Sequence, residues 1–227
     1  YEQIWTKAGS PLIISTLKIK EKLIKKTGWH VEIAMRYEDP SIELALNNLK
    51  SNGFNKVYVV PLYPHNAMAT TITTKVEVER LAREIYPEAE LRFIKPFYKN
   101  EKYIKAISKG VRKYLSQHNF DKLIFSYHGI PKRQAKKTDI TGAHCFENND
   151  CCEVESLGSN DCYKAHTVQS SILIAKELGL KSSEWEIAYQ SRIGPGWLTP
   201  FTDKRLERLP TDCLLYTSDA ADETVRV

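Results

Sequence analysis

The chain has 227 residues, of which 42% are hydrophobic and 27% charged, a composition typical of a globular protein with a sizeable core. Its 33 Lys and Arg residues exceed its 28 Asp and Glu residues by five, which suits an anionic ligand and argues against a nucleic-acid-binding domain. No apolar run approaches the roughly 20 residues of a membrane-spanning helix.

Short apolar runs alternate with amphipathic stretches along the chain. Strands are expected at residues 31–35, 57–60, 91–94, 123–127 and 185–189. Helices are expected at residues 41–51, 71–85, 101–116 and 163–178, and residues 129–161 read as a long polar loop. This alternation predicts an α/β fold of parallel sheets flanked by helices on both faces.

Neither end of the sequence reads as a natural terminus. Residues 1–5 contain no initiator Met and no apolar signal stretch. Residues 213–227, which include Cys213, break the preceding pattern and resemble a translated sequencing adapter. We therefore expect a chain that is truncated at both ends, with a non-native tail after residue 212.

Unusual side chains follow four of the predicted strands. They are Arg36 and Tyr37, then Tyr63, then His128, and finally Gln190, Ser191, Arg192 and Trp197. Ligands of parallel sheets bind beyond the carboxyl ends of the strands. Aromatic rings pack against flat apolar ligands, and guanidinium groups pair with carboxylates. These residues would suit a flat ligand that carries acids.

Four ordered motifs resemble those of the ferrochelatase family. They are Gly-Ser-Pro-Leu at 9–12, Pro-Leu-Tyr-Pro at 61–64, Phe-Ser-Tyr-His-Gly-Ile-Pro at 125–131, and Gln-Ser-Arg at 190–192 with Trp-Leu-Thr-Pro-Phe-Thr-Asp at 197–203. The resemblance implies two Rossmann-like, chelatase-type domains with porphyrin bound between them. We expect the first within residues 1–95 and the second within 96–210, including a cysteine-rich insertion at 142–162.

The resemblance also implies a reaction, the insertion of Fe²⁺ into protoporphyrin IX to form heme with release of two protons. His128 would be the catalytic, metal-site histidine, as proton acceptor or metal ligand. Substrate-binding roles carry over to Arg36, Tyr37, Tyr63, Gln190, Ser191, Arg192 and Trp197. The family's acidic partner of the histidine would follow Pro210, so we expect this fragment to be inactive.

Without the support of the surrounding motifs, each of these residues would have a simpler, structural explanation. A histidine at a strand end is most often structural, Arg36 and Arg192 would be surface ion-pair partners, and Tyr63 and Trp197 would be packing residues. The remaining histidines of the central region have no motif support, and we expect His65, His118, His144 and His166 at the surface.

Four cysteines lie within 18 residues, at Cys145, Cys151, Cys152 and Cys162. A cytosolic protein rarely forms disulfides, and the Cys-x2-Cys pairs typical of zinc sites are absent. Four thiolates can hold a [2Fe–2S] cluster, and the resemblance to bacterial ferrochelatases with an internal cysteine insertion favours it. Among the explanations for the four cysteines, a [2Fe–2S] cluster therefore ranks first, a zinc site second and free thiols third.

Two other functions stay open, an inactive iron–sulfur or tetrapyrrole-binding sensor and a related chelatase for cobalt or nickel. A zinc-bearing nucleic-acid module is disfavoured by the alternating pattern and the mild charge. We expect a cytoplasmic protein that binds porphyrin and ferrous iron but no nucleic acid. A hydrophobic substrate and product would suit a peripheral contact with a membrane. The sequence leaves the oligomeric state open.

Overall fold

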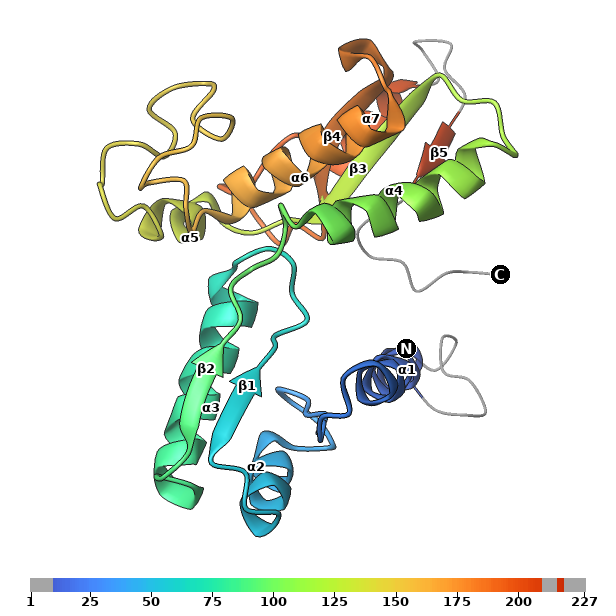
Figure 1. Ribbon diagram of the computed structural model, residues 1–227. Helices are drawn as coiled ribbons and strands as arrows, with labels where there is room; N and C mark the ends of the chain where they lie inside the picture. The colour runs from blue at the N-terminus through green and yellow to red at the C-terminus, as the bar shows by residue number, and fades with distance from the viewer. Residues whose placement is uncertain (1–9, 210–215, 219–227) are drawn as a thin grey trace. The chain divides into compact units, whose positions relative to one another are not determined.

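A computed structural model describes residues 10–209 and 216–218, which form two compact units (Figure 1). Within the described residues, the first unit comprises residues 10–61 and 72–94 and the second comprises residues 62–71, 95–209 and 216–218. Each unit contains a small parallel sheet flanked by helices, which confirms the expected α/β class. The expected domain boundaries stay a prediction.

The first unit is built on strands β1 and β2, which pair in parallel. Its elements are α1 (Pro11–Thr27), α2 (Ile42–Ser51), β1 (Lys56–Val59), α3 (Thr73–Ile85) and β2 (Glu90–Phe93). A single π-helical turn, η2 (Met68–Ile72), precedes α3. The helices α2 and α3 share a core made of Ile42, Leu46, Val78 and Ala82. The Ser41 hydroxyl accepts a hydrogen bond from the Leu44 N–H, which explains why α2 begins where the sequence predicts.

One expectation for this unit is wrong. Residues 31–35 form no strand, because the chain turns back on itself and the Met35 N–H binds the Pro40 carbonyl at 2.7 Å. Only an isolated bridge joins Met35 to Ser41. The strand β1 exposes Tyr58, whose ring stacks on Trp29 with 5.6 Å between the ring centres.

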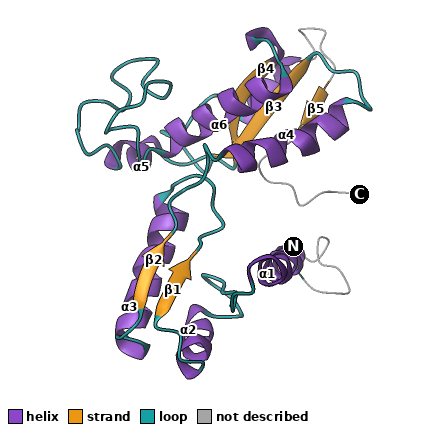
Figure 2. Ribbon diagram, viewed as in Figure 1, coloured by secondary structure: helices purple, strands orange, loops and turns teal. Residues whose placement is uncertain are grey.

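The second unit has strand order β4-β3-β5, all parallel (Figure 2). Its elements are α4 (Glu101–Leu115), β3 (Lys122–His128), α5 (Lys132–Lys137), α6 (Tyr163–Leu178), η3 (Ser182–Glu184), β4 (Trp185–Gln190), α7 (Thr202–Arg208) and β5 (Tyr216–Ser218). The short helix α5 lies within the expected polar loop. The strand β5 lies in the segment expected to be non-native, and that assignment of residues 213–227 stays a prediction.

Side chains of β3 alternate between the two faces of this sheet. Leu123, Phe125 and Tyr127 join the large core that also contains residues of α4 and α6. Ile124 points to the opposite face and packs with Ala188 and Leu209, next to α7. This period-two alternation places helices on both faces, as the sequence predicts for this unit.

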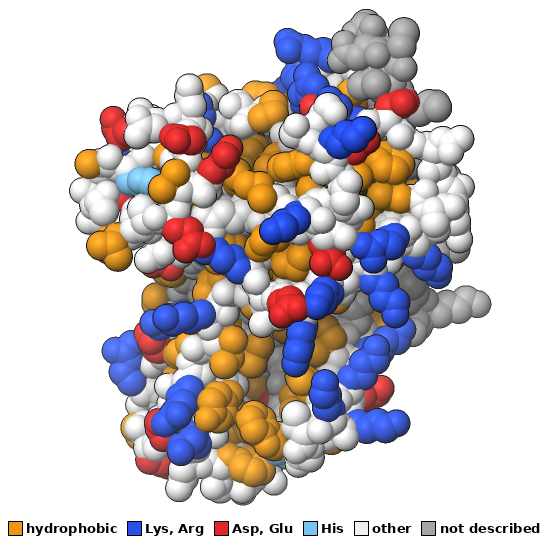
Figure 3. Space-filling view, turned by 45° about the horizontal axis from the view of Figure 1, so that its top comes forward, with side chains coloured by type: hydrophobic (Ala, Val, Ile, Leu, Met, Phe, Trp, Pro, Cys, Tyr) orange, Lys and Arg blue, Asp and Glu red, His pale blue; other side chains and the backbone are white. Residues whose placement is uncertain are grey.

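No helix in the described part of the chain combines the length and apolar character needed to cross a bilayer. On the face drawn in Figure 3, Lys and Arg side chains are interspersed with Asp and Glu.

Candidate functional site

The carboxyl ends of β3 and β4 lie side by side, and the motif residues follow them directly. His128 is in register with Gln190, and the Gly129 N–H donates a hydrogen bond to the Gln190 carbonyl at 2.8 Å. Because both strands run parallel, the side chains that follow them meet at one edge of the sheet. The structure thus brings together two motifs that are more than sixty residues apart in the sequence.

Residues after the two strands are joined by backbone contacts. Pro131 and Trp197 form an antiparallel bridge, and the Leu198 N–H donates to the Ile130 carbonyl at 3.0 Å. A Cβ atom at Gly129 would lie 2.7 Å from the Gln190 carbonyl oxygen and 3.4 Å from Cε3 of Trp197. Glycine is therefore required for this close approach. We call residues 128–131 together with 190–198 the strand-end segment.

The side chain of His128 is exposed, while its backbone is anchored. Its carbonyl accepts a hydrogen bond from the Tyr163 hydroxyl at 2.9 Å. The imidazole is therefore available to a ligand and does not lie in the packed core. This is the arrangement that a proton-accepting or metal-binding histidine needs.

Arg192 is already paired with an acid. Its guanidinium forms two contacts with the Asp203 carboxylate, 3.2 Å from Nη1 to Oδ1 and 2.9 Å from Nη2 to Oδ2. It also lies 4.2 Å above the Phe201 ring. The preceding residue, Ser191, has a left-handed backbone with φ of 62°. The guanidinium of Arg192 presents the bidentate geometry that binds carboxylates, and an acidic ligand would have to displace Asp203 from it.

The other sequence-predicted residues lie on loops. Arg36 and Tyr37 belong to the first unit, where the Arg36 guanidinium lies 4.7 Å from the centre of the Tyr37 ring. Nε of Arg36 is buried and has no hydrogen-bond partner among the described residues. Tyr37 is 76% exposed. Tyr63 is half-buried in the second unit. The substrate-binding roles of these three residues stay predictions.

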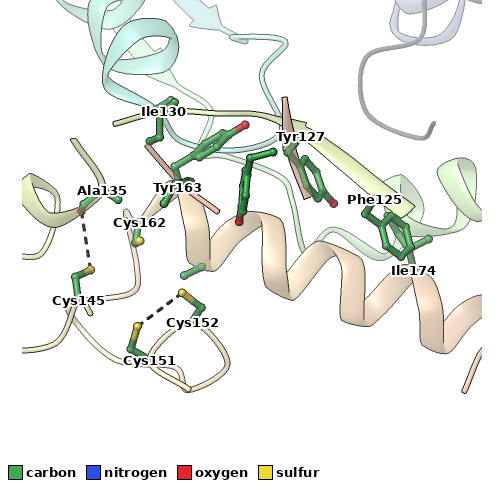
Figure 4. Packing of buried hydrophobic residues seen from close by; sticks show 14 of the residues in the cluster. Phe125, Tyr127, Ile130, Ala135, Cys145, Cys151, Cys152, Cys162, Tyr163 and Ile174 are labelled. Carbon is green, nitrogen blue, oxygen red and sulfur yellow. Dashed lines mark hydrogen bonds between the residues drawn. The ribbon is translucent and has the colours of Figure 1, made fainter. Parts of the chain in front are cut away.

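The four clustered cysteines are all buried free thiols, and their sulfur atoms point toward one another (Figure 4). The Cys151 and Cys152 sulfurs are 3.8 Å apart. The Cys145 sulfur lies 3.9 Å from the carbonyl oxygens of Ala135 and Gly158. Among the described residues, however, no group of three or more His, Cys, Asp or Glu side chains is arranged to hold a metal ion.

Burial raises the pKa of the Cys145 thiol to about 12, and the neighbouring Cys162 thiol contributes to the rise. The pKa of Cys152 is also raised, mainly by burial and further by Cys151 and Cys162, although Lys164 opposes the shift. These shifts show that the thiols are close enough to influence one another. Both thiols stay protonated at neutral pH unless a cation stabilises the thiolates.

A polar frame holds the segment of residues 138–162, which we call the cysteine loop. The Asp139 carboxylate accepts hydrogen bonds from the backbone N–H groups of His144 and Cys145, both at 2.8 Å, and from Thr141. These bonds, led by that from the Thr141 hydroxyl, hold the pKa of Asp139 well below its usual range. His144 Nε2 lies 2.7 Å from the Cys151 carbonyl oxygen. Hydrogen bonds of the frame thus hold the backbones of Cys145 and Cys151.

Two histidines expected at the surface are buried, so that prediction is wrong. His65 is 8% exposed and His166 is 1% exposed. The His166 ring accepts the Asn66 N–H at Nδ1 and stacks on Tyr98 at 3.7 Å. Burial lowers the pKa of His166 to about 4 and that of His65 to about 3. The sequence did contain a signal for the burial of His166, because this residue lies one helical turn from Tyr163 and from Ser170 on α6.

Comparisons with known proteins show to which family the chain belongs. The ferrochelatase family model matches residues 1–214. Curated ferrochelatases of Pseudomonas fluorescens strain Pf0-1 and Stutzerimonas stutzeri strain A1501 are 37% and 38% identical over 214 residues. The ferrochelatase of Azotobacter vinelandii strain DJ is 38% identical over 216 residues. Each match covers 92% of this chain and 62% of the relative. The chain therefore belongs to the ferrochelatase family.

Proposed function

We propose that the protein to which this sequence belongs inserts Fe²⁺ into a porphyrin and releases two protons, forming heme. The observation that carries the proposal is the exposed His128 imidazole at the joined ends of β3 and β4, in a chain of the ferrochelatase family. The chain spans 62% of the length of the curated relatives, so the activity is proposed for the whole protein.

The strand-end segment supplies the chemistry that this reaction needs. Two pyrrole N–H protons must leave as the metal enters, and His128 would accept a proton or hold the incoming iron. Trp197, half-buried beside Gly129, would pack against a face of the macrocycle. Arg192 would bind a propionate in place of the Asp203 carboxylate. Gln190, Ser191, Tyr63, Arg36 and Tyr37 complete the proposed substrate contacts.

We also propose that Cys145, Cys151, Cys152 and Cys162 bind a [2Fe–2S] cluster, with zinc as the second choice. Their fit to the cluster is chemical: they are four buried free thiols whose sulfurs point toward one another. A bound cation would favour loss of the thiol protons. Because metal insertion transfers no net electrons, a bound cluster would brace the loop or sense redox conditions.

The activity is tested with the complete gene product, protoporphyrin IX and Fe²⁺ under anaerobic conditions. We expect His128→Ala to lower heme formation by about 10²- to 10⁴-fold, because a positioned acid–base group contributes that much. The matched control is His118→Ala, an exposed histidine bonded to the Tyr114 carbonyl, which should keep full activity. Full activity of His128→Ala would contradict the proposal, and faster insertion of Co²⁺ than Fe²⁺ would favour the related chelatase.

The metal of the cysteine loop is tested separately by purifying the protein without oxygen. We expect visible absorption typical of iron–sulfur proteins, with iron and acid-labile sulfide in equal amounts, and loss of both in Cys162→Ser. A colourless protein with stoichiometric zinc would support the second choice, and a protein with neither would contradict metal binding at this loop.

A further inference from the structure

The first turn of α6 touches both the cysteine loop and the strand-end segment. Cys162 is the residue that caps α6, and Tyr163 is its first helical residue. The Tyr163 hydroxyl donates its hydrogen bond to the carbonyl of His128 at 2.9 Å. In Figure 4 the Tyr163 ring extends from the start of α6, beside Cys162, toward the chain near Ile130. Cys162 is thus the sequence neighbour of Tyr163, which contacts the backbone of His128 directly.

Tyr163 has little freedom to move by itself. Its side chain is only 9% exposed, and it belongs to the same core as Ile130 and Cys162. The start of its helix is held from outside as well, because His166 binds the Asn160 carbonyl at 2.8 Å and the Asn66 N–H at 3.0 Å. The start of α6, the Tyr163 side chain and the His128 carbonyl are therefore held in one arrangement.

The contact matters because the imidazole of His128 is exposed. Surrounding side chains do not enclose the ring, so its position depends mainly on where the backbone places the Cα–Cβ bond of His128. That backbone is fixed by the Tyr163 hydroxyl on the His128 carbonyl and by the Gly129 N–H on the Gln190 carbonyl. A misplacement of about 1 Å at a reacting group can lower a rate about 100-fold.

We propose that Tyr163 is a positioning residue that holds His128 and couples it to the cysteine loop. It acts through the backbone carbonyl of His128 and does not touch the substrate. A change at Cys162, whether loss of a bound metal or substitution, shifts the adjoining Tyr163 and thereby changes the rate at His128. This inference rests on the proposed ferrochelatase activity.

The test compares two tyrosines in the complete protein. Tyr163→Phe removes only the hydroxyl, and we expect kcat for heme formation to fall about tenfold while KM for porphyrin and the folded fraction stay the same. The matched control is Tyr127→Phe, which removes another β3–α6 hydrogen bond, the 2.9 Å contact between Tyr127 and Ser171. Because that bond does not involve His128, its loss should leave kcat per folded molecule within twofold.

The coupling is tested by combining variants. Cys162→Ser should lower kcat in the otherwise natural protein and have no further effect when Tyr163→Phe is already present, since coupled residues are not additive. Equal kcat values per folded molecule for Tyr163→Phe and Tyr127→Phe would overturn the positioning role. Additive effects of Cys162→Ser and Tyr163→Phe would overturn the coupling. An active His128→Ala would instead refute the proposed function itself, so the two failures are distinguishable.

Discussion

The strand-end segment and the cysteine loop meet at the start of α6, yet they are built in opposite ways. Reactive side chains in the strand-end segment are open to solvent, and hydrogen bonds between backbones hold the segment together. Cysteines of the loop are buried, and side chains such as Asp139 and His144 hold the loop. This difference fits the roles that we propose for the two regions, because a group that meets a substrate has to be accessible, whereas groups that hold a cofactor are enclosed by a supporting frame.

Glycine substitutions can sharpen this comparison, because each region contains one glycine without room for a side chain. Gly129→Ala would place a Cβ atom 2.7 Å from a backbone oxygen of β4, so the two strand ends must separate. We expect a loss of about 1–3 kcal/mol in the free energy of unfolding and a fall of about tenfold or more in heme formation. Urea unfolding and the insertion assay measure the two effects.

The control for this variant lies in the same segment. A Cβ atom at Gly194 would meet nothing within 4 Å, so Gly194→Ala should change neither quantity appreciably. If Gly129→Ala kept natural stability and activity, the close contact between the strand ends would not be needed, and the strand-end segment would lose its role as a unit.

Gly158→Ala makes the corresponding change in the cysteine loop. Its Cβ atom would lie 2.5 Å from Cβ of His144 and 2.6 Å from the Asp139 carboxylate, so the polar frame must open. We expect a destabilisation of about 1–3 kcal/mol by overpacking. The buried thiols should also react faster with a thiol reagent. Gly110→Ala on α4, where a Cβ atom meets nothing within 4 Å, is the control and should leave the thiols protected.

A third experiment uses pH to test the burial of His166 on α6, the helix at whose start the two regions meet. Below about pH 6.5 the unfolded chain binds a proton at His166, whereas burial delays protonation in the folded protein to a pKa of about 4. The contribution of His166 to the free energy of unfolding is therefore fully present above about pH 6.5 and is lost as the pH falls toward 4. At pH 5.5 the expected loss is about 1.4 kcal/mol.

His166→Gln should reduce the difference in urea midpoint between pH 7.5 and pH 5.5, because it removes one of the two buried histidines. The remaining buried histidine, His65, keeps part of the dependence. His118→Gln, which changes an exposed side chain, should leave the dependence as it is in the natural protein. Identical pH dependence in His166→Gln and the natural protein would show that burial of His166 does not affect stability.

The smallest expected effect concerns the ion pair of Arg192. Asp203→Asn removes the carboxylate that occupies the guanidinium, and a partly exposed pair contributes only about 0–1 kcal/mol to stability. The free energy of unfolding should therefore change little. In contrast, KM for porphyrin should fall a few-fold, because the acid of the substrate no longer competes with Asp203 for the guanidinium. An unchanged KM in the complete protein would argue against Arg192 as a propionate ligand.

Local patterns predicted many of the elements. The helix α6 begins and ends at the predicted residues, and β1, β2, β3 and β4 each lie within a residue or two of the expected runs. The helices α1, α5 and α7 were not predicted. For α5 and α7 the reason is length, because six or seven residues are too few to show a helical period. Burial along α6 does not follow the polarity of the side chains: Ile172 is 36% exposed, while Thr167 and Ser170 are fully buried.

By itself the sequence determined the fold class and the family, because alternating periodicity and ordered motifs are local properties that survive without coordinates. Only the tertiary structure decided which side chains meet. Burial of His65 and His166, the pairing of Arg192 with Asp203 and the contact of Tyr163 with His128 all follow from how distant strands and helices pack. Such contacts depend on long-range geometry, and residue spacing along the chain does not encode it.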